Sequence, residues 1–288
     1  MTDLSIDRHL HQSSVGVSES DARLAGRPAG GRRLGPGRRV PGMLALGPLL
    51  LLLAWLLASA TGVLDPRTLS APWTVVGTAG ELIADGRLQS NLLASLQRAG
   101  TALVLGVAAG LVLALVAGLS RVGEALVDGP IQIKRAVPTV ALIPLAILWF
   151  GIGEQMKIII ILASVLVPIY LNTYAGLRGI DERYVELAET VGLSRYQFIR
   201  RVALPGALPG FFTGLRLGVT MSWLALAVVE QVNATSGIGY LMAQARTYGQ
   251  TEIIVVGLVG YGIFGLVGDT LVRIVERRSL AWRRTLGG

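Results

Sequence analysis

Long apolar runs separated by short polar segments make up most of this chain, and their lengths predict its architecture. An α-helix needs about 20 apolar residues to cross the hydrocarbon core of a membrane. Six runs are near or above that length: Met43 to Gly62, Leu92 to Gly118, Val127 to Phe150, Met156 to Leu177, Ala207 to Val229 and Ile253 to Val275. The pattern predicts an all-α, polytopic membrane protein with six transmembrane helices.

The third and fourth runs contain the features that should distort them. Lys134 and Arg135 fall inside the third run, which makes it the least regular of the six. Pro138 and Pro144 in the third run and Pro168 in the fourth are expected to kink their helices, because proline removes a backbone hydrogen bond. Helices buried among other helices tolerate such kinks in a membrane.

Composition agrees with a membrane protein and excludes some chemistry. Of 288 residues, 52% are hydrophobic and 15% are charged. The chain has no cysteine, and its two histidines, His9 and His11, lie in the polar N-terminal leader, so no metal centre is expected. The net charge of +8 would suit nucleic acid, but arginines lie at the ends of apolar runs, as orientation signals do. No nucleic-acid partner is therefore predicted.

The distribution of arginine predicts the topology. Most arginines lie in three polar regions: residues 1–42, residues 178–206 and residues 277–288. The loops that six spans would place on the other side carry few: Arg67, Arg87 and Arg246. By the positive-inside rule the three arginine-rich regions are cytoplasmic. Both termini should then face the cytoplasm, with the chain in the inner (cytoplasmic) membrane of a bacterium.

The N-terminal part carries two further predictions. The leader, residues 1–42, is rich in Gly, Arg and Ser and lacks the apolar residues for a core, so it is predicted to be disordered. The run at residues 43–62 contains Ala58-Ser59-Ala60, which has the pattern of a signal-peptidase site. Cleavage would remove this first span. The long leader, about 42 residues, favours its retention as a signal anchor.

A charged segment between the fourth and fifth runs interrupts the apolar pattern. Asp181 can cap a short helix, and Gly192 can end it in the left-handed conformation. Ser194 and Gln197 have the spacing of a capping box and begin a second short helix, which Pro205 should stop. Two amphipathic helices joined at a glycine are predicted. Such helices suit a lipid surface or a protein partner.

The spacing of residues within this segment carries a family resemblance. The positions concerned are Glu186, Leu187, Ala188, Gly192, Val202, Leu204 and Pro205. They resemble the EAA loop of bacterial ABC importer permeases, with Leu187 in place of a second alanine and Val202 in place of isoleucine. The runs ALIPLAILWFGIGE and SGIGYL are also similar to permeases for aliphatic sulfonates, taurine and nitrate. The resemblance covers roughly residues 90 to 280.

The resemblance implies a fold, a partner and an assembly. It implies the type I ABC importer permease fold over residues 90–276, and docking of residues 178–206 into a groove of an ATPase subunit. The assembly would be a permease homodimer in the lipid bilayer with two ABC ATPase subunits and a periplasmic or lipid-anchored solute-binding protein. The substrate would be an aliphatic sulfonate or taurine. Nitrate, bicarbonate and a thiamine-precursor pyrimidine stay open as alternatives.

The chain itself is not expected to hydrolyse ATP. Its two lysines, Lys134 and Lys157, do not end a glycine-rich loop of the kind that cradles phosphates. ATP and Mg²⁺ would therefore be bound by the partner ATPase, and this chain is expected to be a transporter subunit without a cofactor. The apolar runs also offer no histidine, cysteine or paired acid and base for an intramembrane enzyme.

Several residues within the runs are candidates for a translocation pathway: Trp149, Tyr170, Asn172, Trp223 and Glu230. Helix packing or an aromatic belt at the membrane surface explains the aromatic residues equally well. Asp269 is a further intramembrane ionisable residue, but it can pair with Arg273 one turn later. An ion-coupled secondary transporter is the alternative from another class. It would need paired intramembrane carboxylates or inverted repeats, and neither is clear.

Two glycine pairs predict close contacts between helices. Gly106 and Gly110 lie in the second run, and Gly214 and Gly218 lie in the fifth. Small residues four positions apart let helix backbones approach each other. Packing within the chain is the favoured interpretation, and a seam between two copies is the alternative.

Overall fold

The computed structural model describes residues 43–281, and this part of the chain consists of helices and connecting loops without a strand. The predicted leader and the end of the predicted tail lie outside the described residues. The chain divides into two units between Leu53 and Ala54, within helix α2 (Met43–Ala60). Apart from α2, the features below belong to the second unit.

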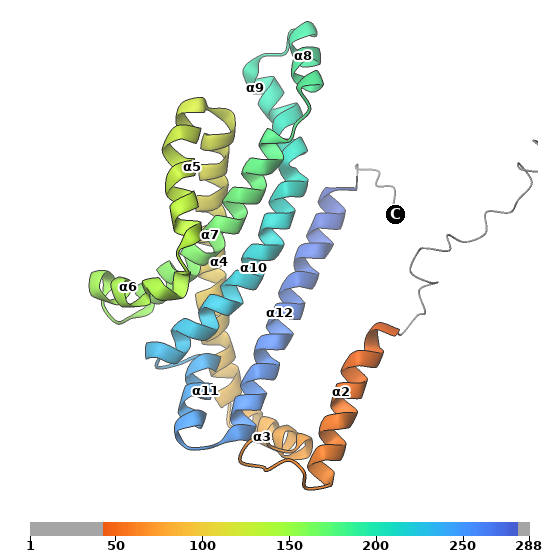
Figure 1. The fold of residues 1–288 in the computed structure, drawn as a ribbon, viewed down its shortest axis with the longest axis vertical. Helices are drawn as coiled ribbons and strands as arrows, with labels where there is room; N and C mark the ends of the chain where they lie inside the picture. The colour runs from red at the N-terminus through yellow and green to blue at the C-terminus, as the bar shows by residue number, and fades with distance from the viewer. Residues whose placement is uncertain (1–42, 282–288) are drawn as a thin grey trace, which may run out of the picture. The chain divides into compact units, whose positions relative to one another are not determined.

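The helices of this unit follow one another with short connections. They are α3 (Pro72–Ala84), α4 (Arg87–Leu119), α5 (Arg121–Ala136), the 3-10 helix η1 (Thr139–Leu142), α6 (Ile143–Phe150), α7 (Glu154–Arg178), α8 (Glu182–Thr190), α9 (Arg195–Phe198), the π-helix η2 (Ile199–Ala203), α10 (Leu204–Asn233), α11 (Ile238–Thr247) and α12 (Thr251–Ser279). Helix α7 packs between α4 and α10, and α12 packs against α10 (Figure 1). Helices α8 and α9 lie beyond one end of this group.

The six predicted spans are only partly matched. Helices α4, α7 and α12, together with the continuous run from Arg195 to Val232, are long and apolar enough to cross a membrane. Helix α2, Met43–Ala60, covers most of the first predicted span, which stays a prediction. The described residues therefore hold four candidate spans, or five if the bent third run counts as one.

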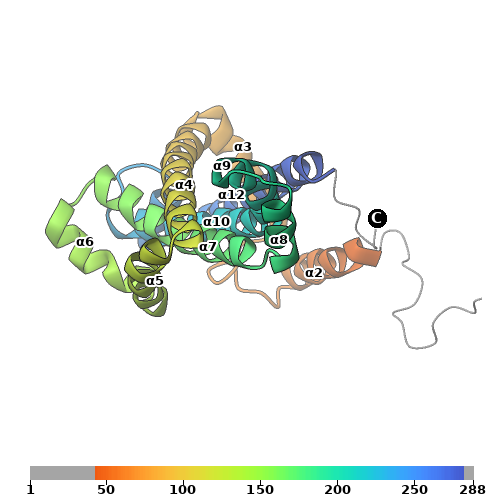
Figure 2. The ribbon, with the colours of Figure 1, turned by 90° about the horizontal axis from the view of Figure 1, so that it is seen from above.

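The third run is not the single kinked span expected from the sequence. Helix α5 and the η1–α6 segment meet at an angle of 95°. The break falls at Pro138, and Val137 before it is extended, with φ −91° and ψ 121°, because the proline ring excludes the helical conformation there. Figure 2 shows α6 leading away from the other helices on the side of α5.

The fifth run also differs from the prediction at its start. Pro205 does not stop the second short helix, because α9, η2 and α10 form one continuous helical element. The proline occupies the first turn of α10, where proline is tolerated. The π-helical turn just before it marks the irregularity in the hydrogen-bond ladder. Helix α9 is therefore continuous with α10.

The glycine pairs are used for packing within the chain, as favoured from the sequence. Gly106 and Gly110 of α4 face α7, and Gly214 and Gly218 of α10 also face α7. A Cβ added at Gly214 would lie 2.8 Å from the carbonyl oxygen of Pro168. The helices thus touch along their backbones, which only small residues permit.

Two helices, α3 and α11, lie outside the apolar runs and were not predicted. Both pack against α12, near its N-terminal end. Val75 and Leu82 of α3 meet Leu241 and Ala245 of α11 and Ile253 of α12 in one buried apolar cluster. This cluster closes the end of the unit that lies opposite α8 and α9 (Figure 1).

Candidate functional site

The charged segment folds as its local sequence predicts. The Asp181 carboxylate accepts a hydrogen bond from the backbone N–H of Arg183 at 3.0 Å and caps α8. Ser194 caps α9: its Oγ accepts from the N–H of Gln197 at 3.3 Å, and the Gln197 Oε1 accepts from the N–H of Ser194 at 2.9 Å. The predicted cap and capping box are confirmed.

Gly192 joins the two short helices in the left-handed conformation, with φ +72°. Its N–H donates to the carbonyl of Glu189 at 3.0 Å, and the N–H of Leu193 donates to the carbonyl of Ala188 at 2.9 Å. A Cβ at this position would meet no atom within 4 Å. The need for glycine is therefore conformational, since a side chain disfavours positive φ.

The segment is attached to the ends of the long helices. Leu177 of α7 packs with Ala203 of η2 and Ala207 of α10, and Ile180 and Phe198 join this cluster. In addition, the guanidinium of Arg195 donates to the carbonyl of Leu119, the last residue of α4, at 2.9 Å. Helix α9 and the turn before α8 thus contact the ends of α4, α7 and α10.

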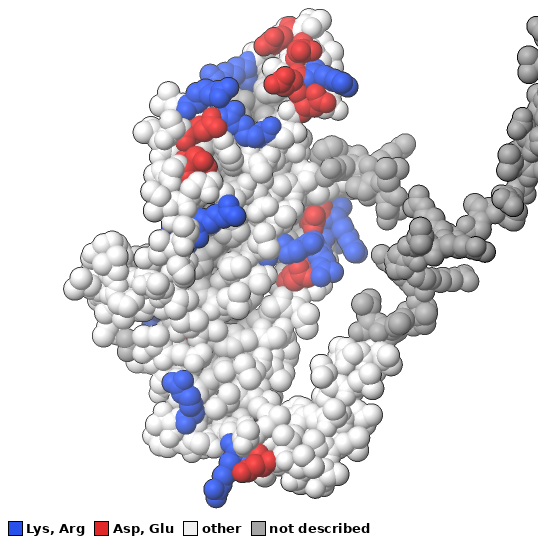
Figure 3. Space-filling model, in the orientation of Figure 1, with Lys and Arg blue, Asp and Glu red and all other residues white. Residues whose placement is uncertain are grey.

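The outer surface of the segment carries exposed apolar and acidic side chains. Tyr184, Leu187, Val191 and Tyr196 are exposed apolar residues. Glu182, Glu186 and Glu189 of α8 are also exposed. Figure 3 shows charged side chains gathered at this end, with a second group lower down beside α12. We call the exposed residues of α8, with Val191 and Tyr196, the α8 surface.

The structure places the EAA-like residues in two groups. Glu186, Leu187, Ala188 and Gly192 lie on α8 and its end, and Ala188 alone among them is buried. Val202 belongs to η2, while Leu204 and Pro205 begin α10. A cavity of about 460 Å³ lies between the start of α8 and the start of α10, and Tyr184, Val202 and Pro205 are among its lining residues.

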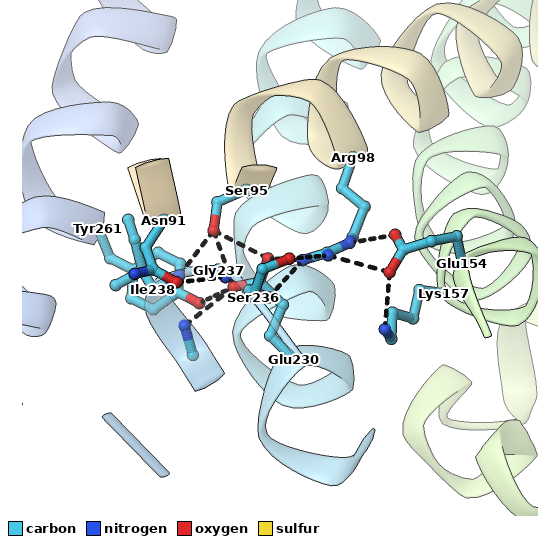
Figure 4. Close-up of polar contacts among 11 residues, drawn as sticks. Asn91, Ser95, Arg98, Glu154, Lys157, Glu230, Ser236, Gly237, Ile238 and Tyr261 are labelled. Atoms are coloured by element: carbon cyan, nitrogen blue, oxygen red, sulfur yellow. Dashed lines mark hydrogen bonds and ion pairs between the residues drawn. The ribbon is translucent and has the colours of Figure 1, made fainter. Parts of the chain in front are cut away.

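A second polar site surrounds Glu230, near the opposite end of α10 (Figure 4). Glu230 is only 1% exposed. Its carboxylate accepts from Ser95 Oγ at 2.8 and 2.9 Å, from the N–H of Gly239 at 2.9 Å and from the Tyr261 hydroxyl at 3.0 Å. It also forms an ion pair with Arg98. A buried carboxylate has to be satisfied in this way.

Arg98 connects this carboxylate to a second one. Its guanidinium is 5% exposed, pairs with both Glu230 and Glu154, and donates to the carbonyl and the hydroxyl of Ser236 at 3.0 Å each. Lys157, also buried, donates to Glu154 at 2.9 Å. Two cations thus balance two carboxylates, and four helices supply the network. We call these residues, with Ser95 and Tyr261, the Glu230 network.

The SGIGYL run, Ser236 to Leu241, lies beside the Glu230 network and donates backbone hydrogen bonds to side chains of α4. The N–H of Gly237 donates to Asn91 Oδ1 at 2.8 Å, and the N–H of Ile238 donates to Ser95 Oγ at 2.8 Å. Gly237 has φ +116°, and a Cβ there would lie 2.3 Å from a Glu230 carboxylate oxygen. This glycine is therefore required both by its backbone conformation and by the closeness of Glu230.

The other pathway candidates lie in separate environments on three helices. Trp149 of α6 is exposed, whereas Tyr170 of α7 is fully buried and donates to Asp128 at 3.1 Å. Asn172 donates to the carbonyl of Pro168 in its own helix at 2.9 Å. Trp223 of α10 stacks on Phe264 of α12, with ring centroids 4.9 Å apart.

Asp269 forms the predicted pair with Arg273 one turn later, at 2.7 Å. Arg216 of α10 joins them: it lies 3.4 Å from Asp269 and 2.6 Å from Glu276. These four partly exposed charges link α10 to α12.

Apart from Glu230, the residues of the Glu230 network were not predicted as a site. Arg98 and Lys157 stand as isolated charges within apolar runs, and this was the one signal available. Their partners are distant in sequence, since Arg98 lies 132 residues from Glu230 and 56 from Glu154.

The fold and these two sites define a helical membrane protein with a cluster of buried charges at one end and a structured, exposed segment at the other. Residues 106–280 match the family described as the binding-protein-dependent transport system inner membrane component. The chain belongs to this family of membrane transport permeases.

Individual relatives agree with the family, and a solved structure has a similar fold. The chain is 43% identical to an Escherichia coli (strain K12) protein, provisionally named aliphatic sulfonates transport permease protein SsuC, over 82% of this chain and 89% of that protein. It is 32% identical to the taurine transport system permease protein TauC of the same organism, over 83% and 89%. The crystal structure of an amino acid ABC transporter with histidines has the same fold, with a TM-score of 0.57 at 19% identity, covering 72% of this chain and 97% of that one.

Proposed function

We propose that this chain is the transmembrane subunit of an ATP-driven ABC importer for aliphatic sulfonates or taurine. The family and the names of the relatives support this assignment. The chain would act as a homodimer in the bacterial inner membrane, with both termini in the cytoplasm. Two ABC ATPase subunits would bind ATP and Mg²⁺, and a solute-binding protein would deliver the substrate from outside.

The α8 surface is the observation that carries this proposal. Its exposed apolar residues stand beside exposed carboxylates on a short helix with well-formed caps. Exposed apolar groups rimmed by polar ones mark interaction sites. A lipid surface is a poorer partner for α8 itself, whose three exposed glutamates outnumber its single arginine, Arg183. Interfacial helices are typically basic, and anionic lipid repels carboxylates. A protein groove, here that of the ATPase, fits both kinds of side chain.

The connections of α8 and α9 supply a path for the motion. Helix α8 follows α7 after a three-residue turn, and α9 continues into α10. A displacement of the α8 surface by the ATPase would therefore move α7 and α10 together. Such rigid movements of packed helices can open a cavity alternately to the two sides of a membrane.

An ion-coupled secondary transporter is the competing function, and Glu230 is the residue that favours it. Buried intramembrane carboxylates commonly mark ion pathways. Here, however, Arg98 and three neutral donors already satisfy this carboxylate. Uptake by vesicles that contain this chain alone, driven by a proton or sodium gradient, would support the competing function.

The deciding experiment combines co-purification of the ATPase with substrate uptake. Glu186→Lys reverses an exposed charge on the α8 surface, and mismatched charges at an interface can cost several kcal/mol. We expect it to weaken ATPase binding and uptake at normal expression. Asp85→Lys is the matched control, because Asp85 is exposed at the opposite end of the unit, between α3 and α4. Wild-type behaviour of Glu186→Lys in both assays would refute the docking surface.

A further inference from the structure

A pocket of about 400 Å³ opens beside the Glu230 network, and we call it the Glu154 pocket. Its polar and charged lining residues are Gln97, Arg98, Thr101, Glu154 and Ser236. Glu154 is the first residue of α7, and the other end of α7 leads to α8. The pocket and the α8 surface therefore lie at opposite ends of α7. In the proposed topology the pocket is on the outer side, where a substrate would arrive.

The Arg98 guanidinium has one sealed side and one open side. Glu230, on the sealed side, is buried and accepts hydrogen bonds from three neutral donors besides Arg98. Glu154 lies on the other side of the guanidinium and accepts from its Nε and Nη2 with both carboxylate oxygens (Figure 4). The side chain of Glu154 is 55% exposed and lines the pocket. A group arriving in the pocket therefore meets this carboxylate without opening the sealed side.

Two cations hold the Glu154 carboxylate in place. Among the described residues, Arg98 and Lys157 are its hydrogen-bond donors. Glu154 can rotate into the pocket and be hydrated there, because its side chain is already more than half exposed. Lys157 is buried, and in the described part of the chain its ammonium donates to Glu154 alone. A buried ammonium without a counter-ion is strongly unfavourable. Departure of Glu154 therefore requires another anion in its place.

The balance of charge in the Glu230 network sets the charge of the anion that can replace Glu154. Arg98 and Lys157 supply two positive charges, and the sealed Glu230 keeps one negative charge beside them. One positive charge is therefore left over when Glu154 leaves, and one negative charge restores the balance. A dianion would place a second, unbalanced negative charge near Glu230. Like charges at a poorly solvated site repel each other strongly.

We propose that Glu154 is a displaceable counter-ion, which a monovalent oxyanion replaces on Arg98 and Lys157 as it enters the Glu154 pocket. This inference rests on the proposed function and concerns how the transported anion is selected. The fork of a guanidinium fits two oxygens of one oxyanion. Sulfonate, nitrate and bicarbonate groups all offer two such oxygens and a single negative charge. Sulfate offers the same oxygens with two charges, so the site rejects it by charge.

The first test is thermal unfolding of Glu154→Gln in the full-length chain, in phosphatidylcholine nanodiscs at one heating rate. The amide removes the internal anion and leaves both cations in place. When sodium methanesulfonate replaces sodium sulfate at constant ionic strength, the unfolding midpoint should rise by about 5 to 10 °C at about 100 times the dissociation constant. The rise is measured relative to wild type, because sulfate stabilises proteins in general. A relative rise of zero would overturn the inference.

A double variant separates anion binding from a change in packing. Glu154→Gln combined with Lys157→Gln removes one charge of each sign, so no anion is needed for balance. We expect this double variant to lose the methanesulfonate-dependent rise. Glu81→Gln is the control for the single change, because Glu81 is exposed on α3 and lies outside the pocket lining. It should respond as wild type does. A double variant that responds as strongly as Glu154→Gln would refute the role of the two cations.

Equilibrium binding of radiolabelled methanesulfonate measures the competition with Glu154 directly. Glu154→Gln should bind it about 10- to 100-fold more tightly than wild type, the range for a hydrogen bond to a charged group, because the internal carboxylate no longer competes. Nitrate should displace the bound methanesulfonate, and sulfate at equal ionic strength should not. Displacement by sulfate as strong as that by nitrate would overturn the selection by charge.

An anionic lipid headgroup is the other source of a monovalent oxyanion, and nanodiscs that contain phosphatidylglycerol distinguish it. If methanesulfonate keeps its full effect on Glu154→Gln in these nanodiscs, the solute is the ligand. If phosphatidylglycerol alone raises the midpoint and methanesulfonate adds nothing, the pocket is a lipid site and the inference is wrong. ATP-driven sulfonate uptake that is sensitive to Glu186→Lys would still stand in that case, so the two failures can be told apart.

Discussion

Replacing Arg98 with methionine tests whether the Glu230 network holds the end of the helix bundle together. Methionine keeps a long unbranched side chain but removes the charge. The change leaves Glu230, which is 1% exposed, without its cation. Glu154 keeps Lys157 as a partner and is itself 55% exposed on its side chain. The loss should therefore fall mainly on Glu230.

The magnitude follows from the burial of the pair. Removing one partner of a buried ion pair costs about 3 to 5 kcal/mol, because the other charge stays buried and unpaired. Ser95, Gly239 and Tyr261 continue to donate to Glu230 and offset part of this cost. We expect about 3 kcal/mol, which for a chain of this size lowers the unfolding midpoint by about 6 to 12 °C.

The assay is thermal unfolding of each purified variant in identical nanodiscs at one heating rate, since membrane proteins often unfold irreversibly. Arg67→Met is the control, because Arg67 is exposed and a surface change of this kind stays within about 0.5 kcal/mol. Glu230→Gln combined with Arg98→Met should be more stable than Arg98→Met alone, because the amide removes the unpaired charge. An Arg98→Met midpoint equal to that of Arg67→Met would refute the reasoning.

Two further predictions concern the segment around α8. Gly192→Val forces a β-branched residue to φ +72°, at a cost of about 1 to 3 kcal/mol, and should lower substrate uptake per ATP hydrolysed. Gly249→Val, at φ +68° near the opposite end, is the matched control and should leave that ratio unchanged. Because the chain has no cysteine, Ser194→Cys should resist impermeant thiol reagents in intact cells while Thr68→Cys reacts. Labelling of Ser194→Cys from outside would overturn the proposed topology.

Features that depend on neighbouring residues could be predicted well from the sequence. The cap at Asp181, the capping box at Ser194 and the left-handed Gly192 each involve side chains and backbone within a few positions. Long apolar helices could be recognised for the same reason, since length and composition are local properties. The sequence predicts a kink at Pro138. It does not predict the angle of the bend, because packing with other elements decides which way the chain turns.

The Glu230 network shows where prediction from one sequence ends. Its ion pairs join residues on α4, α7 and α10, and its remaining hydrogen bonds come from α12 and the α10–α11 connection. Nothing in the spacing of Arg98 indicates which carboxylate it meets. The sequence also left Glu230 as a pathway candidate, and only the three-dimensional contacts show how completely its oxygens are satisfied.

The packing of α7 decides how far a movement at the α8 surface could be transmitted through the helices. A Cβ at Gly210 would lie 2.4 Å from the carbonyl of Asn172, so α7 and α10 are too close to slide past each other freely. At one end they carry the α8 surface, and at the other the Glu230 network joins them to α4. These three helices should therefore move as one body. Helix α12 is tied to this body by Tyr261, which donates to Glu230, and by the ion pairs of Arg216. A shift driven at the α8 surface should therefore carry α12 with it.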